Sequence, residues 1–391
     1  MTPAPTPSTT APPFSDRRRV ALWVGTYPVD GPDVGVGTGE GVWRVDVHAR
    51  TGAFEELRQI AEIPSPSFLA LHPSGRTLYS VTEASDGVVE AFGLDAAAAD
   101  LEPHPDASLT THGAYPCHVL ATDDAVWVAN YGSGSVSRLP VDDGGAFAGA
   151  TRTDRHTGSG PREDRQEGPH AHFVGRVDDE VWSADLGTDR LVRYAPDGTV
   201  VGEVALPAGS GPRHFVTVPG AVLVVCELDP CVLVVSLGDE AAAEPAVVAR
   251  YDVVDGAPGP AGGQELPVQP SHVALSADGA RLYVAVRGPD VLVAFEVVPA
   301  PGGGQDAGPR DQAPTLRRLA QTPVGGAWPR HFAVVGALGD ELDGADPAAD
   351  LVVVANQVSG TLASLRVARD SGRAELLSTA RVPSPACVLP A

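Results

Sequence analysis

The sequence has no lysine, only four cysteines, one methionine and few aromatic residues. All 27 basic residues are therefore arginines, they face 50 acidic residues, and the formal net charge is −23. A surface this acidic repels phosphate backbones and anionic lipid headgroups, which disfavours binding to nucleic acid or to a membrane surface. The cysteines are too few and too scattered for a disulfide framework or a zinc spacing. Cys226 and Cys231 could bridge a hairpin, but we expect buried free thiols.

Long apolar runs are also missing. No stretch approaches the roughly 18 apolar residues of a membrane-spanning helix. Residues 1–18 are rich in Pro, Thr and Ala and lack the apolar core of a signal peptide, so they predict a disordered tail. We therefore expect a cytoplasmic protein with a single domain over residues 19–391. The absence of G-x-S-x-G, G-x-G-x-x-G and P-loop motifs disfavours an esterase serine elbow and a nucleotide-binding loop.

A motif that begins with proline recurs about every fifty residues. Each copy contains three short runs of Val, Leu and aromatic residues bounded by Gly, Asp, Ser or Pro, which is typical of strands. Five copies of these three runs cover residues 66–92, 116–139, 169–194, 212–235 and 270–295. A sixth copy begins with 329–335 and resumes at 350–365.

Three strands in each copy and a fourth in the spacer predict a four-stranded antiparallel sheet, and radial repetition of such sheets predicts a β-propeller. Residues 19–47 supply only the second and third runs of a copy, while 383–390 supply only a first run. The prediction is an all-β, seven-bladed propeller whose ring is closed by N- and C-terminal strands in one blade, which leaves no open sheet edge. Gly, Pro, Asp and Ala dominate four spacers, interpreted as rim loops at 152–168, 253–268, 298–315 and 336–350.

Alignment of the copies defines two columns of residues. The first column, the residue after each marker proline, is Ser67, Cys117, His170, Arg213, Ser271, Arg330 and Ala386. The second column, at the end of each second run, is Tyr27, Glu83, Tyr131, Leu186, Glu227, Arg287 and Gln357. The start of one strand and the end of its antiparallel neighbour lie at the same edge, so both columns should meet on one face near the axis. Charged residues in some blades and small ones in others predict a binding site there.

Purely structural interpretations stay open for these residues. Arg213 or Arg330 could be a rim arginine paired with a carboxylate. A histidine two places after the proline recurs at His118, His214, His272 and His331, which indicates packing between blades. His170 and His172 have a metal-like spacing, but no carboxylate follows at ligand distance, so we predict no metal.

At this point the motifs resemble a known family. "GPHAHF", "GSGPRHF", "CELD", "GGAWPRHF" and "VANQVSG" are similar, in order, to segments of the lactonase-type seven-bladed propellers. That family includes bacterial 6-phosphogluconolactonase and a fungal carboxymuconate cyclase, and the resemblance runs from about Arg19 to Pro390. The sequence departs from the family at Cys226 and Val286, where asparagine is common, and in "WPRHF", where "WPRDF" is usual.

The resemblance implies a lactonase without a cofactor, acting on a small, anionic sugar lactone of the 6-phosphogluconolactone type, as in the pentose phosphate pathway. It implies four catalytic residues: His170, Glu227, Arg213 and Arg287. We expect His170 to activate water with help from Glu227, and the two arginines to stabilise the oxyanion. The columns add the candidate substrate-binding residues Arg330, Glu83, Tyr131 and Gln357. His172, two residues after His170 and in neither column, is a fifth candidate.

Three alternatives stay open at this stage. The site could cycloisomerise a carboxylated muconate, with the arginines holding carboxylates. The propeller could be a non-catalytic platform for a protein or a small ligand. A metal on the axis could polarise the carbonyl group of a lactone. We expect a monomer or a weak homodimer.

Overall fold

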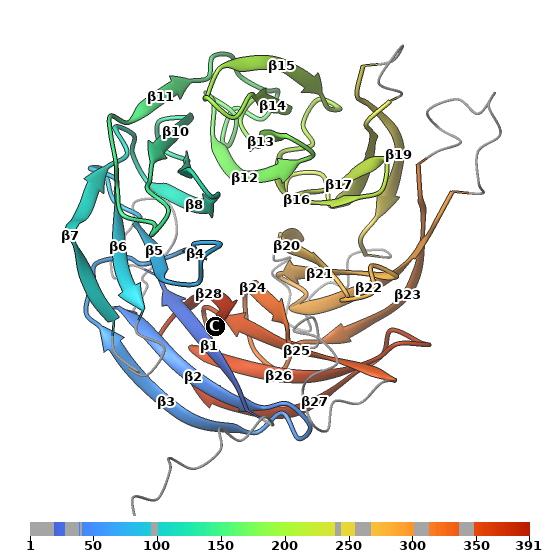
Figure 1. Ribbon diagram of the computed structural model, residues 1–391. Helices are drawn as coiled ribbons and strands as arrows, with labels where there is room; N and C mark the ends of the chain where they lie inside the picture. Colours follow the sequence, from blue (N-terminus) through green and yellow to red (C-terminus); the bar gives the residue numbers. More distant parts are fainter. Residues whose placement is uncertain are drawn as a thin grey trace, which may run out of the picture.

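The structure is a computed structural model in which 28 strands form seven four-stranded antiparallel sheets arranged as a wheel (Figure 1). The described residues are 19–27, 39, 41–94, 101–238, 244–254, 267–300, 313–335 and 348–391. The tail predicted for residues 1–18 lies outside them, as do large parts of the spacers at 253–268, 298–315 and 336–350. The predicted all-β seven-bladed propeller is confirmed.

The sheets are numbered here as blades 1 to 7, each from its innermost strand outwards. Blade 1 contains β28 (Pro385–Pro390), β1 (Arg19–Thr26), β2 (Val42–His48) and β3 (Phe54–Ala61). Blade 2 contains β4 (Leu69–Leu71), β5 (Thr77–Thr82), β6 (Val88–Leu94) and β7 (Leu101–Thr110). Blade 3 contains β8 (Pro116–Ala121), β9 (Ala125–Asn130), β10 (Ser135–Pro140) and β11 (Arg152–Arg155). Blade 4 contains β12 (Ala171–Val177), β13 (Glu180–Asp185), β14 (Arg190–Tyr194) and β15 (Val200–Ala205).

The remaining blades follow the same order. Blade 5 contains β16 (Pro212–Val218), β17 (Ala221–Cys226), β18 (Cys231–Ser236) and β19 (Ala246–Asp252). Blade 6 contains β20 (Gln269–Leu275), β21 (Arg281–Arg287), β22 (Val291–Val298) and β23 (Thr315–Pro323). Blade 7 contains β24 (Pro329–Val334), β25 (Ala349–Asn356), β26 (Thr361–Ala368) and β27 (Ala374–Arg381). The innermost strands of neighbouring blades contact one another around the axis.

The ring closes through the two ends of the chain. β28 pairs with β1, with Val388 opposite Val24 and Leu389 opposite Trp23. The C-terminal strand is thus the innermost strand of a blade whose other three strands come from the N-terminal segment, as predicted from the incomplete repeats at the two ends. Closure of this kind pairs the first strand of the chain and removes an open sheet edge.

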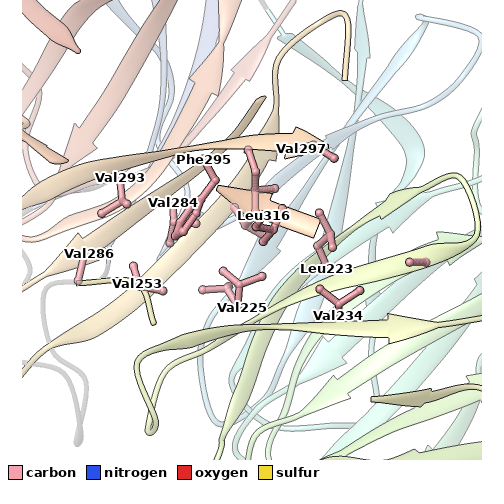
Figure 2. Close-up of a cluster of buried hydrophobic side chains, with 14 of the residues drawn as sticks. Leu223, Val225, Val234, Val253, Val284, Val286, Val293, Phe295, Val297 and Leu316 are labelled. Atoms are coloured by element: carbon pink, nitrogen blue, oxygen red, sulfur yellow. The ribbon is translucent and has the colours of Figure 1, made fainter. Parts of the chain in front are cut away.

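The core lies between blades, where the apolar faces of neighbouring sheets meet. The middle strands are buried on both faces, which explains uninterrupted apolar runs such as "AVLVVC" in β17 and "CVLVVS" in β18. Figure 2 shows one such interface, where Leu223 and Val225 of blade 5 pack towards Val284 and Phe295 of blade 6. All four cysteines are buried free thiols, which confirms that expectation.

A β-bulge at the start of the innermost strand is the local feature that positions the site. In β16 the register shifts between Pro212 and His214, which leaves Arg213 outside the ladder. β24 repeats this shift, and there Arg330 is the extra residue. A bulge re-aims a side chain without breaking the sheet, so each blade can present one residue towards the axis.

The interface between blades 5 and 6 predicts a sharp contrast between two substitutions on β22. Phe295→Ala removes a side chain that is 1% exposed and should lower the free energy of unfolding by about 3–5 kcal/mol. Val298→Ala, on the same strand but 38% exposed, should change it by less than about 1 kcal/mol. Urea denaturation followed by tryptophan fluorescence measures both. Equal effects would contradict the assignment of the core to the space between blades.

Candidate active site at the propeller axis

A pocket of about 530 Å³ opens where the two columns of the sequence alignment meet. Residues from all seven blades and from the connection between blades 3 and 4 form its walls. The lining residues include all nine candidates named from the sequence: His170, Glu227, Arg213, Arg287, Arg330, Glu83, Tyr131, Gln357 and His172. The remaining lining residues are Tyr27, Cys117, Asp164, Arg165, Glu167, Gln269, Trp328 and Val358.

The second column is a true structural column. In six blades the residue of this column, which follows the second strand, donates its backbone N–H to a carbonyl group just before the innermost strand, and in blade 6 Arg287 pairs with Gln269 within the sheet. Glu227 N–H donates to Gly211 O at 2.8 Å, and Gln357 N–H donates to Trp328 O at 3.0 Å. Leu186 N–H makes the same bond, 2.9 Å long, with His170 O. These shared bonds hold the side chains of the column at one rim of the axis.

The first column needs one correction, in blade 4. The bulge of β12 lies between Ala171 and Phe173, so the residue outside the ladder is His172. His170 lies two residues earlier, in the place that Gly211 takes in blade 5. In the sequence Pro169 has the appearance of a marker proline. In the structure, however, Ala171 occupies the position that Pro212 has in blade 5, directly before the bulge. Both histidines still line the pocket.

Glu227 is the centre of the charged cluster. Its Oε2 accepts from Arg213 Nε at 3.0 Å and from Arg287 Nη2 at 2.5 Å, and its Oε1 accepts from Arg165 Nη2 at 2.8 Å. Burial alone would raise the pKa of this carboxyl group, but Arg287, Arg213 and Arg165 hold the pKa well below its usual range. Glu227 is therefore a fixed carboxylate that organises three guanidinium groups, and the expected contact with His170 is not among its hydrogen bonds.

Two of these arginines are held rigidly. Arg213 also donates through Nη1 to Ser271 O and to His214 Nε2. Burial and the charge of Arg287 lower the pKa of Arg213 to about 9, which leaves it charged at neutral pH. Arg287 donates through Nε to the Gln269 carbonyl oxygen at 3.3 Å, and its guanidinium group lies over the Trp328 ring.

Arg330 differs from the other pocket arginines because its side chain makes no hydrogen bond to any residue that the structure describes. It is 8% exposed, lies 4.3 Å over the Tyr27 ring and is 3.9 Å from Glu83 Oε2. Tyr27 in turn donates its hydroxyl hydrogen to Glu83 Oε1 at 3.1 Å. A nearly buried guanidinium group with open donors is poised for an anionic or carbonyl oxygen.

His170 lies at the pocket mouth and stacks on Tyr131, with 4.4 Å between ring centroids. Its Nδ1 is 3.0 Å from the Tyr131 carbonyl oxygen, and a carbonyl oxygen only accepts, so Nδ1 carries a hydrogen. Glu167 Oε1, on an exposed side chain, lies 3.1 Å from Nε2, so Nε2 donates in this arrangement. Nε2 has a free lone pair only in the neutral ring, with the exposed Glu167 carboxylate turned away from it.

Arg165 is a site residue that the sequence does not identify. Arg165 belongs to the spacer at 152–168, for which a rim loop is predicted. In the structure, residues 152–155 of this spacer form strand β11, and Arg165 lines the pocket. The buried Gln166 anchors this segment by donating to Leu186 O and to Asp189 Oδ1, both at 2.8 Å. Spacers have no repeat partner with which to align, so no sequence signal could mark Arg165.

A cluster of neutral histidines, called the histidine floor below, packs behind the lining arginines, and only His172 of this cluster lines the pocket itself. As the sequence indicated, these side chains pack between blades. His272 stacks on His331 with 3.8 Å between centroids, and His214 Nδ1 is 2.9 Å from His272 Nδ1. Burial lowers the pKa of each, to about 3 for His331, so the floor adds no positive charge beneath the arginines. The full set with lowered pKa is His118, His172, His214, His272 and His331.

Two general features complete the description. Within the described part of the chain, no group of three or more His, Cys, Asp or Glu side chains is arranged to hold a metal ion. The same residues form no helix that is long and apolar enough to cross a membrane.

Fold and pocket together define a seven-bladed propeller with an axial small-molecule site built from arginine, glutamate and histidine side chains. A family model described as Lactonase, 7-bladed beta-propeller, matches residues 21–390. The chain belongs to this family and is a lactonase, an enzyme that opens a cyclic ester with water. The resemblance expected from the motifs is confirmed.

Known relatives span almost the whole chain. A 6-phosphogluconolactonase of Bacillus subtilis is 30% identical and aligns over 94% of this chain and 97% of its own length. A 6-phosphogluconolactonase of Formosa agariphila is 26% identical over 87% of this chain and 92% of its own. The periplasmic gluconolactonase of Pseudomonas aeruginosa superimposes with a TM-score of 0.77 at 26% identity, covering 95% of this chain and 99% of that one. The cytoplasmic location and the oligomeric state stay predictions.

The histidine floor predicts a loss of stability in mild acid. Because burial lowers these pKa values, the folded state binds fewer protons than the unfolded state below about pH 6.5, and stability must fall as the pH falls. Each buried histidine should contribute about 1.4 kcal/mol per pH unit below that point. Urea unfolding at several pH values between 7 and 5 measures the slope.

Two variants make this measurement specific. His272→Asn should remove about one histidine's share of the slope, whereas His112→Asn, at an exposed position, should leave the slope unchanged. A stability that stays constant between pH 7 and pH 5 would contradict the neutral floor.

Proposed function

We propose that the protein hydrolyses a phosphorylated sugar lactone of the 6-phosphogluconolactone type. The observation that carries this proposal is the charge of the pocket in a chain with a formal net charge of −23. Four guanidinium groups line it, from Arg165, Arg213, Arg287 and Arg330, and the only buried carboxylates among the lining residues are Glu83 and Glu227. Two further lining carboxylates, Asp164 and Glu167, are exposed and therefore screened by solvent. Among the buried and half-buried lining side chains the guanidinium groups exceed the carboxylates by two, which suits a dianionic phosphate monoester.

The chemical step uses His170 as the base. Its Nε2 takes a proton from a water molecule while the water oxygen attacks the lactone carbonyl carbon. The new C–O bond pushes the carbonyl electrons onto oxygen, and this oxyanion receives hydrogen bonds from Arg213 and Arg287. When the ring C–O bond breaks, the imidazolium group returns the proton to the leaving ring oxygen. The products are a hydroxyl group and a carboxylic acid, which ionises.

Glu227 has a supporting role in this scheme. Its pKa is held so low by three arginines that it cannot serve as a base near neutral pH. It instead holds Arg213 and Arg287 side by side against their mutual repulsion, with both bonded to one carboxylate oxygen. Pre-oriented donors of this kind need no rearrangement when charge develops in the transition state.

Arg330 takes the phosphate group. The structure describes no hydrogen bond from this side chain to the protein, so its donor fork is available to phosphate oxygens. Tyr27 and Glu83 hold it from one side through the ring face and a 3.9 Å ion pair. The phosphate would then lie away from the Glu227 cluster, with the sugar ring between them.

The substrate class is tested by a panel of lactones with and without a phosphate group, assayed by acid release. We expect kcat/KM for the phosphorylated lactone to exceed that of its unphosphorylated analogue by at least about 100-fold. This factor corresponds to a charge-assisted contact with the phosphate that contributes about 3 kcal/mol. Equal values would remove the phosphate assignment. Turnover of a carboxylated muconate, with no lactone opened, would replace hydrolysis by cycloisomerisation.

Two arginine variants separate chemistry from binding. Arg213→Ala should reduce kcat by about 10²–10³-fold, because it removes an oxyanion donor. Arg330→Ala should mainly raise KM for the phosphorylated lactone and leave kcat within about threefold. Steady-state kinetics on protein checked by circular dichroism measures both. Wild-type constants for both variants on every lactone would sink the assignment.

A further inference from the structure

A chain of polar groups that the proposed mechanism does not use joins blade 4 to the end of β11 in blade 3 and to His156, which follows it. His156 Nδ1 lies 2.7 Å from Asp185 Oδ2, and the two side chains are 2% and 0% exposed. His156 Nε2 lies 2.6 Å from the Tyr194 hydroxyl oxygen. The Tyr194 hydroxyl donates to Asp154 Oδ2 at 3.1 Å.

The chain ends on the main chain of His170. The second oxygen of Asp185, Oδ1, accepts the backbone N–H of His170 at 2.8 Å and that of Gly187 at 3.0 Å. A Cβ atom on Gly187 would lie only 2.8 Å from the His170 nitrogen and would collide with the Gly168 carbonyl oxygen. Glycine at this position therefore lets the turn pack directly against the backbone of His170.

A carboxylate oxygen only accepts, so His156 Nδ1 carries the hydrogen of the bond to Asp185. The Tyr194 hydroxyl donates to Asp154, and its oxygen lies against His156 Nε2. The hydrogen bond and the charge of His156 overcome the effect of burial and lower the pKa of Asp185.

The other blades supply an internal comparison for Asp185. The last residue of the second strand, or its equivalent, is uncharged in all of them: Thr26, Thr82, Asn130, Cys226, Val286 and Asn356. A turn at this place therefore needs no carboxylate. A buried carboxylate is expensive to desolvate, so the turn alone does not account for Asp185 in blade 4.

The entry to blade 4 is also different. The residue before the marker proline has a positive φ in five blades, at Ser65, Tyr115, Gly211, Trp328 and Ser384. Its counterparts in the other two blades, His170 in blade 4 and Gln269 in blade 6, have no positive φ and both line the pocket. Of these two, His170 is the one that carries an imidazole, and its N–H donates to Asp185.

We propose that Asp185 and His156 are positioning residues for His170, fixing its main chain so that Nδ1 stays on the Tyr131 carbonyl group and Nε2 faces the pocket. This inference rests on the proposed role of His170. Neither side chain is among the residues that line the pocket. The pair acts through geometry, and a displacement of about 1 Å at a catalytic base can reduce a rate by up to about 100-fold.

The experiment compares four variants of the full chain. Asp185→Ala removes the acceptor of His170 N–H, and kcat should fall by about 10–100-fold with KM within about twofold. Asp185→Asn keeps an oxygen that can accept the same N–H, so kcat should stay within about fivefold of wild type. His170→Gln should abolish the base-dependent rate. Val192→Ala, a buried position on β14 of the same blade, controls for lost stability alone.

A second readout reports the imidazole itself. Nitrogen-15 spectra of protein labelled at histidine distinguish the two ring tautomers, and the His170 signals are those lost in His170→Gln. In Asp185→Ala the Nδ1–H form of His170 should lose its dominance, whereas Asp185→Asn and Val192→Ala should keep it. An unchanged kcat and tautomer in Asp185→Ala would overturn the inference, as would an equal fall of kcat in Val192→Ala.

The arms also separate this inference from the proposed function. Wild-type turnover in His170→Gln would remove His170 as the base, whatever Asp185 does. In that event the tautomer spectra would still decide whether Asp185 positions the ring. Full loss of turnover in His170→Gln, with no effect of Asp185→Ala on kcat or on the spectra, would uphold the proposed function and refute the positioning role.

Discussion

The site depends on one carboxylate at the axis of the wheel. Guanidinium groups repel one another, and desolvation makes the repulsion stronger where water is excluded. Glu227 overcomes this by accepting hydrogen bonds from Arg165, Arg213 and Arg287 at once. These arginines come from a connecting segment and from two blades, so a single side chain joins three parts of the ring. The sheets fix the backbone positions, and Glu227 keeps the three positively charged guanidinium groups together.

The floor beneath the pocket serves the same electrostatic requirement. An aromatic plug at the axis could be made of phenylalanine, and Phe68 and Phe173 do pack there. The histidines add hydrogen-bond capacity without adding charge, because burial keeps them neutral. His214 illustrates this, since its Nε2 accepts from Arg213 while its Nδ1 faces His272. A neutral acceptor at that place orients the arginine, whereas an imidazolium ion would repel it.

Most of the fold and much of the site followed from repetition. The number of blades could be predicted from the strand periodicity and the marker prolines, and the closure of the ring from the incomplete copies at the two ends. These signals are clear because every blade packs against its neighbours in the same way and uses similar residues to do so. Ten of the fourteen residues in the two aligned columns line the pocket. Alignment of the copies misplaced the first column in blade 4, where Pro169 precedes the bulge by two extra residues and His172 is the residue outside the ladder. It could not find Arg165, since a connection without a repeat partner has nothing with which to align.

These successes and failures share a physical cause. Sevenfold repetition fixes backbone positions, and a functional site arises where individual blades depart from the common pattern. The departures at Arg213 and Arg330 replace one side chain and leave the bulge intact, so they can be detected in an alignment. Blade 4 departs in its backbone as well, and its buried Asp185, bonded to His156 from the segment after β11, accompanies that change. A structural comparison among the blades of one chain therefore exposes supporting residues that a comparison of side-chain types alone would overlook.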